Sequence, residues 1–243
     1  MHRLLVETSL LSADAPVLPP AAARHLKVLR PETGEELELF DGKGAWRVYA
    51  WRNGLHAAGG VQSDTNPPAP LVLFACVTKG SRWDWTIAKA TELGVTRIVP
   101  VLSDRTIVRI PRGERAAKRE RWLRIAEDAA RQSDARWLPQ IDEAVDFRDS
   151  LPLVRETTCF VGALTDPPPQ PLLSALLAAE IPRSRPIAVY VGPEGDFTLG
   201  ELKALLEIAT PASFGPTVLR AETAAVFAAS VAAAVRLANG FVV

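Results

Sequence analysis

Residues 71–102 run LVLFACVTKGSRWDWTIAKATELGVTRIVPVL. Leu71 to Val77 is an unbroken apolar run, which is typical of a strand buried on both faces of a sheet. Trp83 to Leu93 has the composition of a helix, and Gly94 follows it as a helix-ending residue. Arg97 to Leu102 is the next apolar run. This order of strand, helix and strand predicts an α/β domain with a parallel sheet covered by helices.

The same alternation continues toward the carboxyl end. We predict further strands over residues 158–164 and 187–191, and further helices over residues 114–132, 172–180, 199–209 and 223–238. The Ala-rich run from Ala221 to Asn239 is long enough to suggest a membrane span. It carries Glu222 and Arg236, and alanine contributes little transfer energy, so a buried helix is favoured over a span.

A proline-rich stretch from Asp64 to Pro70 marks a domain junction. Three prolines fall within four residues there, and proline neither donates to a sheet nor continues a helix. We expect a small β-barrel over residues 1–66 and the α/β domain over residues 71–243.

The β character of the first domain comes from a hairpin pattern. Glu36–Phe40 alternates with period two, Asp41–Gly44 is turn material, and Ala45–Trp51 resumes the strand pattern. Pro19–Leu29 has the pattern of one short helix, which Pro31 ends.

The composition is that of a globular intracellular chain. Of 243 residues 48% are apolar, which is enough to bury a core. Cys76 and Cys159 lie in apolar runs without the C-x-x-C metal spacing, so buried thiols are expected. The amino terminus meets Glu7 too early to form a signal-peptide core. We therefore expect a cytoplasmic location, with no membrane and no metal.

The net charge of zero hides an uneven distribution. Residues 105–136 hold 10 basic and 5 acidic side chains, whereas residues 137–243 hold 7 basic and 12 acidic ones. A local basic stripe is expected of a surface that meets phosphates. A solvated helix face with ion pairs such as Glu120 with Arg124 explains the same pattern.

Several enzyme classes are excluded by missing motifs. The chain has no G-x-x-x-x-G-K-[ST], no G-x-S-x-G and no H-E-x-x-H, and it holds only three histidines. Gly42-Lys43-Gly44 lies in a hairpin without a following helix, so it is not a dinucleotide loop. A P-loop ATPase, a serine-triad hydrolase and a zinc enzyme are therefore disfavoured.

The first candidate site follows the strand that ends at Val191. Gly192-Pro193-Glu194-Gly195 comes directly after it, and Thr198 with Glu201 has the spacing of a capping box for the next helix. Open α/β sheets bind ligands at this end of a strand, and glycines let a ligand approach the backbone. An ordinary tight turn before a capped helix is the alternative interpretation.

The second candidate site is the approach to the last helix, from Phe214 to Ala225. Arg220 and Glu222 lie where apolar residues give way to the Ala-rich helix. They are either functional or an ion pair at the start of a helix.

Several motifs together resemble the RsmE family of RNA methyltransferases, in the family's order and over nearly the whole chain. They are Arg24-His25 with Val28-Leu29-Arg30, Lys79-Gly80-Ser81-Arg82, Thr91-Glu92-Leu93-Gly94-Val95, Gln132-Ser133, Gly192-Pro193-Glu194-Gly195, and Leu219-Arg220-Ala221-Glu222-Thr223-Ala224. The chain departs from the family pattern in two places. Asp196 replaces a second glycine, and Arg131, Asp134 and Ala135 replace the acid, glycine and arginine of Glu-Gln-Ser-Gly-Arg, with Arg136 one place on.

The resemblance implies a SPOUT-type α/β domain whose carboxyl-terminal segment threads a trefoil knot, preceded by a PUA-like β-barrel that binds RNA. It implies a homodimer that uses S-adenosylmethionine to methylate N3 of a specific uridine in 16S ribosomal RNA, either free or in the small ribosomal subunit. The implied cofactor-binding residues are Leu164, Thr165, Val191, Gly192, Pro193, Glu194, Gly195, Val218, Leu219, Arg220, Thr223 and Ala224.

Two residues are the catalytic candidates. Uridine N3 carries a proton and is hidden by base pairing, so the enzyme must take an accessible base and help the proton leave. Arg220 is expected to stabilise negative charge on the uracil edge, and Glu194 to accept the proton or to orient Arg220.

The expected RNA-binding residues are mostly cationic. They are Arg24, His25, Arg30, Lys79, Arg82, Arg115, Lys118, Arg121, Arg124, Gln132 and Arg136. Trp46, Trp51 and Trp83 either stack on bases or pack within the protein.

Two alternative functions stay open from the sequence. One is an RNA-binding protein without catalysis, which the two glycine-flanked loops disfavour. The other is a SPOUT methyltransferase that acts on another RNA site, which the amino-terminal Arg-His motif disfavours.

Overall fold

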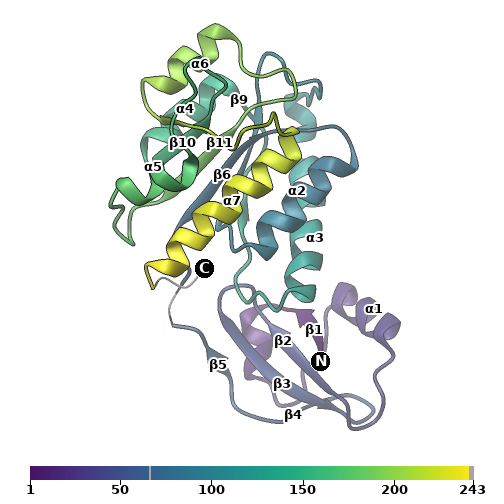
Figure 1. Cartoon of the computed structure of the whole chain (residues 1–243). Helices are drawn as coiled ribbons and strands as arrows, with labels where there is room; N and C mark the ends of the chain where they lie inside the picture. Colours follow the sequence, from purple (N-terminus) through teal and green to yellow (C-terminus); the bar gives the residue numbers. More distant parts are fainter. Residues whose placement is uncertain (66, 241–243) are drawn as a thin grey trace. The chain divides into compact units, whose positions relative to one another are not determined.

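The computed structural model describes residues 1–65 and 67–240, and they form two compact units (Figure 1). The first unit contains Met1–Pro67 together with Glu127–Leu138. The second contains Pro68–Ala126 and the chain from Pro139 on. Helix α3, Arg112–Gln132, therefore begins in the second unit, and its last residues belong to the first.

A seven-stranded parallel sheet forms the centre of the second unit. Its order is β12-β10-β11-β6-β7-β8, and β9 also pairs with β7. The predicted α/β class with a parallel sheet is confirmed. The strands are β6 (Leu71–Cys76), β7 (Arg97–Leu102), β8 (Gln140–Ile141), β9 (Val145–Asp146), β10 (Thr158–Gly162), β11 (Ile187–Val191) and β12 (Thr210–Ala212).

Both faces of this sheet are covered, which explains why its strands are apolar without alternation. Successive side chains of a strand point to opposite faces. Leu71 and Leu73 accordingly pack on the side of α2, α3, α5 and α7, whereas Val72 and Phe74 pack on the side of α4 and α6. These helices are α2 (Ser81–Glu92), α3, α4 (Phe147–Arg155), α5 (Leu172–Ala178), α6 (Leu199–Leu206) and α7 (Ala221–Ala238).

Helix α7 is long and apolar enough to cross a membrane by composition, yet more than half of it is buried in the unit. Near its end Arg236 is buried and donates to the carbonyl oxygens of Pro182 and Arg185. A buried arginine needs such acceptors, because an unpaired charge away from water is costly. The predicted buried helix is confirmed.

The first unit contains a five-stranded sheet in the order β1-β2-β3-β4, with β5 paired to β3. The predicted hairpin is confirmed as β2 and β3, and the Asp41 carboxylate in its turn accepts the amides of Lys43 and Ala45. Leu37, Leu39 and Tyr49 form part of the core. The elements are β1 (His2–Leu5), a 3-10 helix (Thr8–Ser12), α1 (Pro20–Leu29), β2 (Glu36–Phe40), β3 (Ala45–Trp51), β4 (Leu55–Ala57) and β5 (Gln62–Ser63).

The segment Glu127–Leu138 completes the first unit, although the proline-rich junction gave no sign of it. Arg3 is buried and donates to Glu38 at 2.8 Å and to the carbonyl oxygen of Ala130 at 2.7 Å. The Arg136 guanidinium stacks 3.5 Å from the centre of the Trp46 ring. A charged, hydrogen-bonded network thus joins residues far apart in the sequence.

Candidate active site

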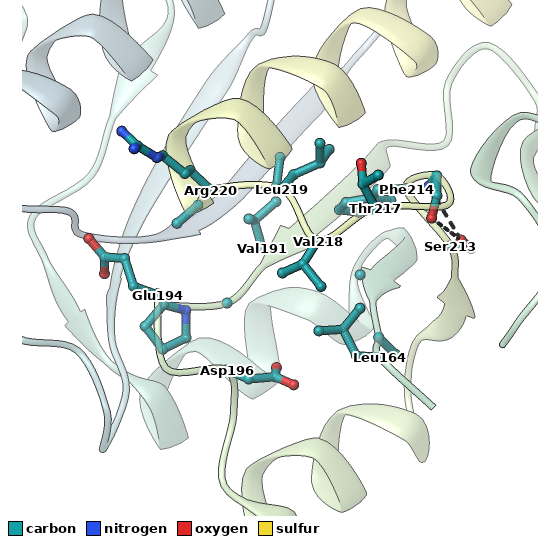
Figure 2. Close-up of a pocket in the computed structure, with 17 residues that line it drawn as sticks. Leu164, Val191, Glu194, Asp196, Ser213, Phe214, Thr217, Val218, Leu219 and Arg220 are labelled. Carbon is teal, nitrogen blue, oxygen red and sulfur yellow. Dashed lines mark hydrogen bonds between the residues drawn. The ribbon is translucent and has the colours of Figure 1, made fainter. Parts of the chain in front are cut away.

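Three loops of the second unit converge on a pocket of about 310 Å³, which we call the three-loop pocket (Figure 2). The loops follow β10, β11 and β12, which are neighbours in the sheet. Because these strands are parallel, their carboxyl ends lie at one edge, where α/β sheets bind ligands. The volume falls within the range of small-molecule sites.

The three-loop pocket brings together residues from both candidate motifs. The predicted cofactor residues that line it are Leu164, Val191, Gly192, Pro193, Glu194, Val218, Leu219, Arg220 and Ala224. Thr165, Gly195 and Thr223 do not line it: Thr165 bonds to the carbonyl oxygen of Pro167, Gly195 faces Arg105, and Thr223 is exposed on α7. Phe214, Gly215, Thr217 and Ala221 also line it; they belong to the second candidate site but not to the predicted cofactor set. Lining residues outside both the predicted cofactor set and that site are Gly162, Ala163, Asp196 and Ser213.

The pocket wall combines exposed apolar side chains with free backbone amides. Leu164 is 65% exposed and Val218 is 77% exposed, so a bound ligand would cover apolar surface that now faces water. Within the described residues, the amides of Gly192, Val218 and Leu219 donate to no protein acceptor. These amides can serve the polar edge of a ligand whose flat face meets the leucine and valine side chains.

The turn after β11 is stabilised by close packing of the Phe197 ring against Gly192. A Cβ at Gly192 would lie 3.0 Å from the Phe197 ring, so the glycine allows this ring to pack closely. Asp196 has a φ of 59°, a left-handed conformation that glycine adopts freely and that aspartate tolerates better than most residues.

The predicted capping box at the start of α6 is present. The Thr198 hydroxyl accepts the amide of Glu201, and the Glu201 carboxylate accepts the amide of Thr198 at 2.9 Å. Glu201 also accepts the amide of Asp104 at 2.9 Å. This carboxylate therefore ties the end of the turn to the loop after β7.

Arg105 holds the same turn through main-chain oxygens. Its guanidinium donates to the carbonyl of Gly195 at 2.9 Å and to that of Phe197 at 3.3 Å. The loop after β7 carries no motif that marks this residue, and only its position after a strand could have suggested it.

Arg220 and Glu194 lie at one side of the pocket, and Asp196 adds a further carboxylate apart from Arg220 (Figure 2). Glu194 forms an ion pair with Arg82 at 3.4 Å. Arg220 is exposed and makes no ion pair within the described residues. Glu222 is only 9% exposed, and its Oε2 has no hydrogen-bond partner there. An Arg220–Glu222 ion pair at the helix start is therefore absent, and Arg220 remains a free cation beside the pocket.

The predicted RNA-binding residues of the second unit fall into two groups. Arg115 is largely buried and bonds Asp146 at 2.6 Å, and Arg121 is paired with Asp84 through both guanidinium nitrogens. The guanidinium groups of Arg115 and Arg121 thus already have carboxylate partners within the protein. Lys79, Lys118 and Arg124 are exposed and make no ion pair within the described residues, while Arg82 is exposed and holds Glu194.

In the first unit the predicted RNA-binding residues also differ in whether their side chains are exposed or already contact other parts of the protein. Arg24, Arg30 and Gln132 are exposed, whereas Arg136 stacks on Trp46 and lies 3.4 Å from Glu38. Burial, and after it the nearby charge of Arg131, lowers the pKa of His25. This shift favours the uncharged imidazole of His25.

The tryptophans show which aromatic rings are accessible. Trp83 is buried and packs edge-on against Trp122, so it belongs to the core. Trp46 is covered by the Arg136 guanidinium. Trp51 lines a groove of the first unit, and Trp85 is exposed on α2.

The cysteines and acids give no sign of a metal centre. Burial raises the pKa of the Cys76 thiol to about 12 and raises the pKa of Cys159 as well. Among the described residues no cluster of three or more histidine, cysteine, aspartate or glutamate side chains could hold a metal ion.

Comparison with known protein families shows to which family the chain belongs. The family model described as the RNA methyltransferase domain matches residues 65–233, and a Synechocystis protein named ribosomal RNA small subunit methyltransferase E is 31% identical over 92% of this chain and 74% of its own. The chain belongs to the RsmE family. A Bacillus subtilis protein of the same name is 31% identical over 67% of this chain, and the match spans 65% of that relative.

Two solved structures align with nearly the whole of this chain. A ribosomal RNA small subunit methyltransferase E from Neisseria gonorrhoeae, bound to S-adenosylmethionine, superposes with a TM-score of 0.77 at 27% identity and covers 98% of both chains. A Legionella pneumophila methyltransferase with the same bound cofactor superposes with a TM-score of 0.76 at 27% identity and covers 96% of both chains.

We predict that Arg105→Ala weakens binding of S-adenosylmethionine about fivefold, because the two hydrogen bonds that hold the Gly195 turn, one exposed and one partly buried, are together worth about 1 kcal/mol. Titration calorimetry measures this. Arg148→Ala is the matched control, since Arg148 is exposed in the same unit and makes no bond within the described chain. Equal affinity of both variants and the unchanged protein would contradict the role of Arg105.

Proposed function

We propose that this protein transfers a methyl group from S-adenosylmethionine to N3 of a specific uridine in 16S ribosomal RNA, in the cytoplasm. The observation that carries the proposal is the three-loop pocket, which joins the Gly-Pro-Glu-Gly turn to the approach of α7 in a chain of the RsmE family. The Neisseria relative, which shares the fold over nearly its full length, holds S-adenosylmethionine.

The residues of the three-loop pocket fit this cofactor chemically. Leu164, Val218 and Leu219 offer apolar surface to an adenine ring, and the free amides of Gly192 and Val218 offer donors to its polar atoms. Asp196 adds a carboxylate to the lining, which suits ribose hydroxyls. When bound, the cofactor supplies an activated methyl group, and the protein contributes binding and alignment.

Arg220 and Glu194 provide the groups that the uridine needs. As the N3–H bond breaks, negative charge spreads over the uracil oxygens, and a fixed guanidinium beside them stabilises that charge. Arg220 has no protein partner within the described chain and is free for this task. Glu194 takes the N3 proton, and Arg82 holds its carboxylate in place. The N3–methyl bond then forms as the methyl–sulfur bond breaks.

We also propose the finer architecture that the family implies. The second unit is a SPOUT domain with a trefoil knot in its carboxyl-terminal segment, and the first unit is a PUA-like barrel. RNA phosphates bind to five exposed cationic residues, which are Arg24, Arg30, Lys79, Lys118 and Arg124. The support for this proposal is that none of the five has an ion pair within the described residues. Arg115, Arg121 and Arg136 act within the protein instead.

A homodimer is proposed from an exposed apolar surface on α5 and α7. Leu173, Leu177, Phe227 and Leu237 are exposed there, although they are large hydrophobic residues. Helices α5 and α7 pack against each other, so the elements that carry these side chains are neighbours. Large apolar side chains exposed on neighbouring elements are typical of protein interfaces.

We predict that Phe227→Asp shifts the protein from dimer toward monomer in sedimentation equilibrium, because the charge would lie in the proposed interface. Leu206→Asp is the matched control, as Leu206 is exposed to a similar degree on α6. A monomeric unchanged protein, or a dimer unaffected by Phe227→Asp, would contradict this surface.

We predict that Arg220→Ala lowers kcat about 10² to 10³-fold with little change in cofactor affinity, as expected for the loss of one charge-stabilising group. The assay follows labelled methyl transfer to unmodified 16S transcripts and to small subunits, with mass spectrometry to locate the methylated uridine. Arg220→Lys should recover part of the activity. Lys203→Ala, which removes an exposed cation from α6, should match the unchanged protein.

Three outcomes of that assay separate the competing functions. Normal turnover by Arg220→Ala with intact binding would refute the role of Arg220. Cofactor and RNA binding without any methyl transfer would favour a non-catalytic RNA-binding protein. Methylation at a position other than uridine N3 would favour a related enzyme with another target.

The RNA-binding assignment predicts a smaller salt dependence after loss of free cations. Replacement of Lys118 and Arg124 by alanine should reduce the slope of log affinity against log salt by roughly 0.7 to 0.9 per phosphate contact. The control replaces Arg148 and Lys203, two exposed cations outside the proposed RNA-binding set. An equal slope for the two double variants in filter binding of 16S transcripts would refute this surface.

A further inference from the structure

We propose that a groove beside helix α1 in the first unit binds one unpaired nucleotide of the substrate RNA, with its base against Trp51 and its phosphate at Lys27 and Arg30. We call it the α1 groove. It has a volume of about 440 Å³ and is lined by residues of α1, of the segment before it and of the β3–β4 turn. The inference rests on the proposed function, because it assigns a second contact to the same RNA.

The floor of the α1 groove is apolar and aromatic. Leu18, Leu26, Leu55 and Trp51 contribute to its lining, and Val17 at its edge is 87% exposed. A nucleobase has a flat apolar face that stacks on an aromatic ring whatever its sequence. Only an unpaired base can enter, since a paired base has both faces covered by its neighbours in the stack.

The edge of the α1 groove is cationic. Lys27 and Arg30 line it, and no acidic residue does. Both side chains are exposed, and neither has an ion pair within the described residues. The residues from Pro20 to Arg30 include no aspartate or glutamate, so the whole helix presents positive charge. This charge favours a phosphate-bearing occupant over an apolar peptide.

The backbone conformation at the end of α1 fixes the position of Arg30, the second cation of the groove. Arg30 caps α1 with a φ of 48°, in the left-handed region, and Pro31 follows it. That conformation ends the helix at the groove instead of carrying the chain past it. Arg30 therefore stands at the end of the helix, where it lines the same groove as Trp51.

The test fills the groove without removing any charge. Ala23 lines the α1 groove, whereas Ala21, on the same helix, is exposed and does not. Ala23→Phe should raise the KM for a 16S transcript about tenfold, in the range of one lost base stack. The kcat at saturating RNA and the affinity for S-adenosylmethionine should stay unchanged. Ala21→Phe should match the unchanged protein in all three.

A second pair of variants tests the cationic edge and does not depend on how well Ala23→Phe folds. Lys27→Ala should lower the salt slope of transcript binding by roughly 0.7. Arg52→Ala removes the same charge from an exposed position of the same unit outside the groove and should leave the slope unchanged.

Equal KM values for Ala23→Phe and Ala21→Phe, or equal slopes for Lys27→Ala and Arg52→Ala, would overturn the inference. A defect of Ala23→Phe on small subunits but not on free transcripts would also overturn it and indicate a protein occupant. If the unchanged protein transfers no methyl group, the proposed function fails. Filter binding of the same transcripts then still decides the groove.

Discussion

The parallel pairing of β12, β10 and β11 is the constraint on which the site depends. Hydrogen bonds between these strands place Gly162, Val191 and Ala212 at one edge of the sheet, although they lie far apart in the sequence. The strands are buried on both faces, so a slip by one residue would move every side chain of the strand into the opposite packed layer, where its shape does not fit, and is strongly disfavoured. The loops after these three strands therefore begin next to one another, and together they line the three-loop pocket.

Arginine serves two different purposes in this chain. Arg3, Arg105 and Arg236 donate to carbonyl or carboxylate oxygens of the protein and hold segments that are distant in sequence. Arg220 and Arg30 have no such partner within the described residues. A count of charges along the sequence cannot separate these purposes, because it does not contain the positions of the acceptors. The cation beside the three-loop pocket and the cations of the proposed RNA surface are therefore those that have no protein partner within the described residues.

How much could be predicted from the sequence depended on local signals. The bounds of β7 and β11 are those predicted, since each is an apolar run between clear breaks, and the capping box of Thr198 is present. Helix α4 was missed because Pro152 lies inside it, and strands of two or three residues such as β12 show no periodicity. Arg105 and the segment Glu127–Leu138 act through partners distant in sequence, which no local pattern reveals.

The central claim is that three separate loops form one binding site for S-adenosylmethionine. Photo-crosslinking with the labelled cofactor, followed by peptide mapping, tests it most directly. The account predicts adducts in residues 162–164, 191–196 and 213–221, all suppressed by an excess of unlabelled cofactor. Adducts that map elsewhere, or that form on one loop without competition by the unlabelled cofactor, would contradict it.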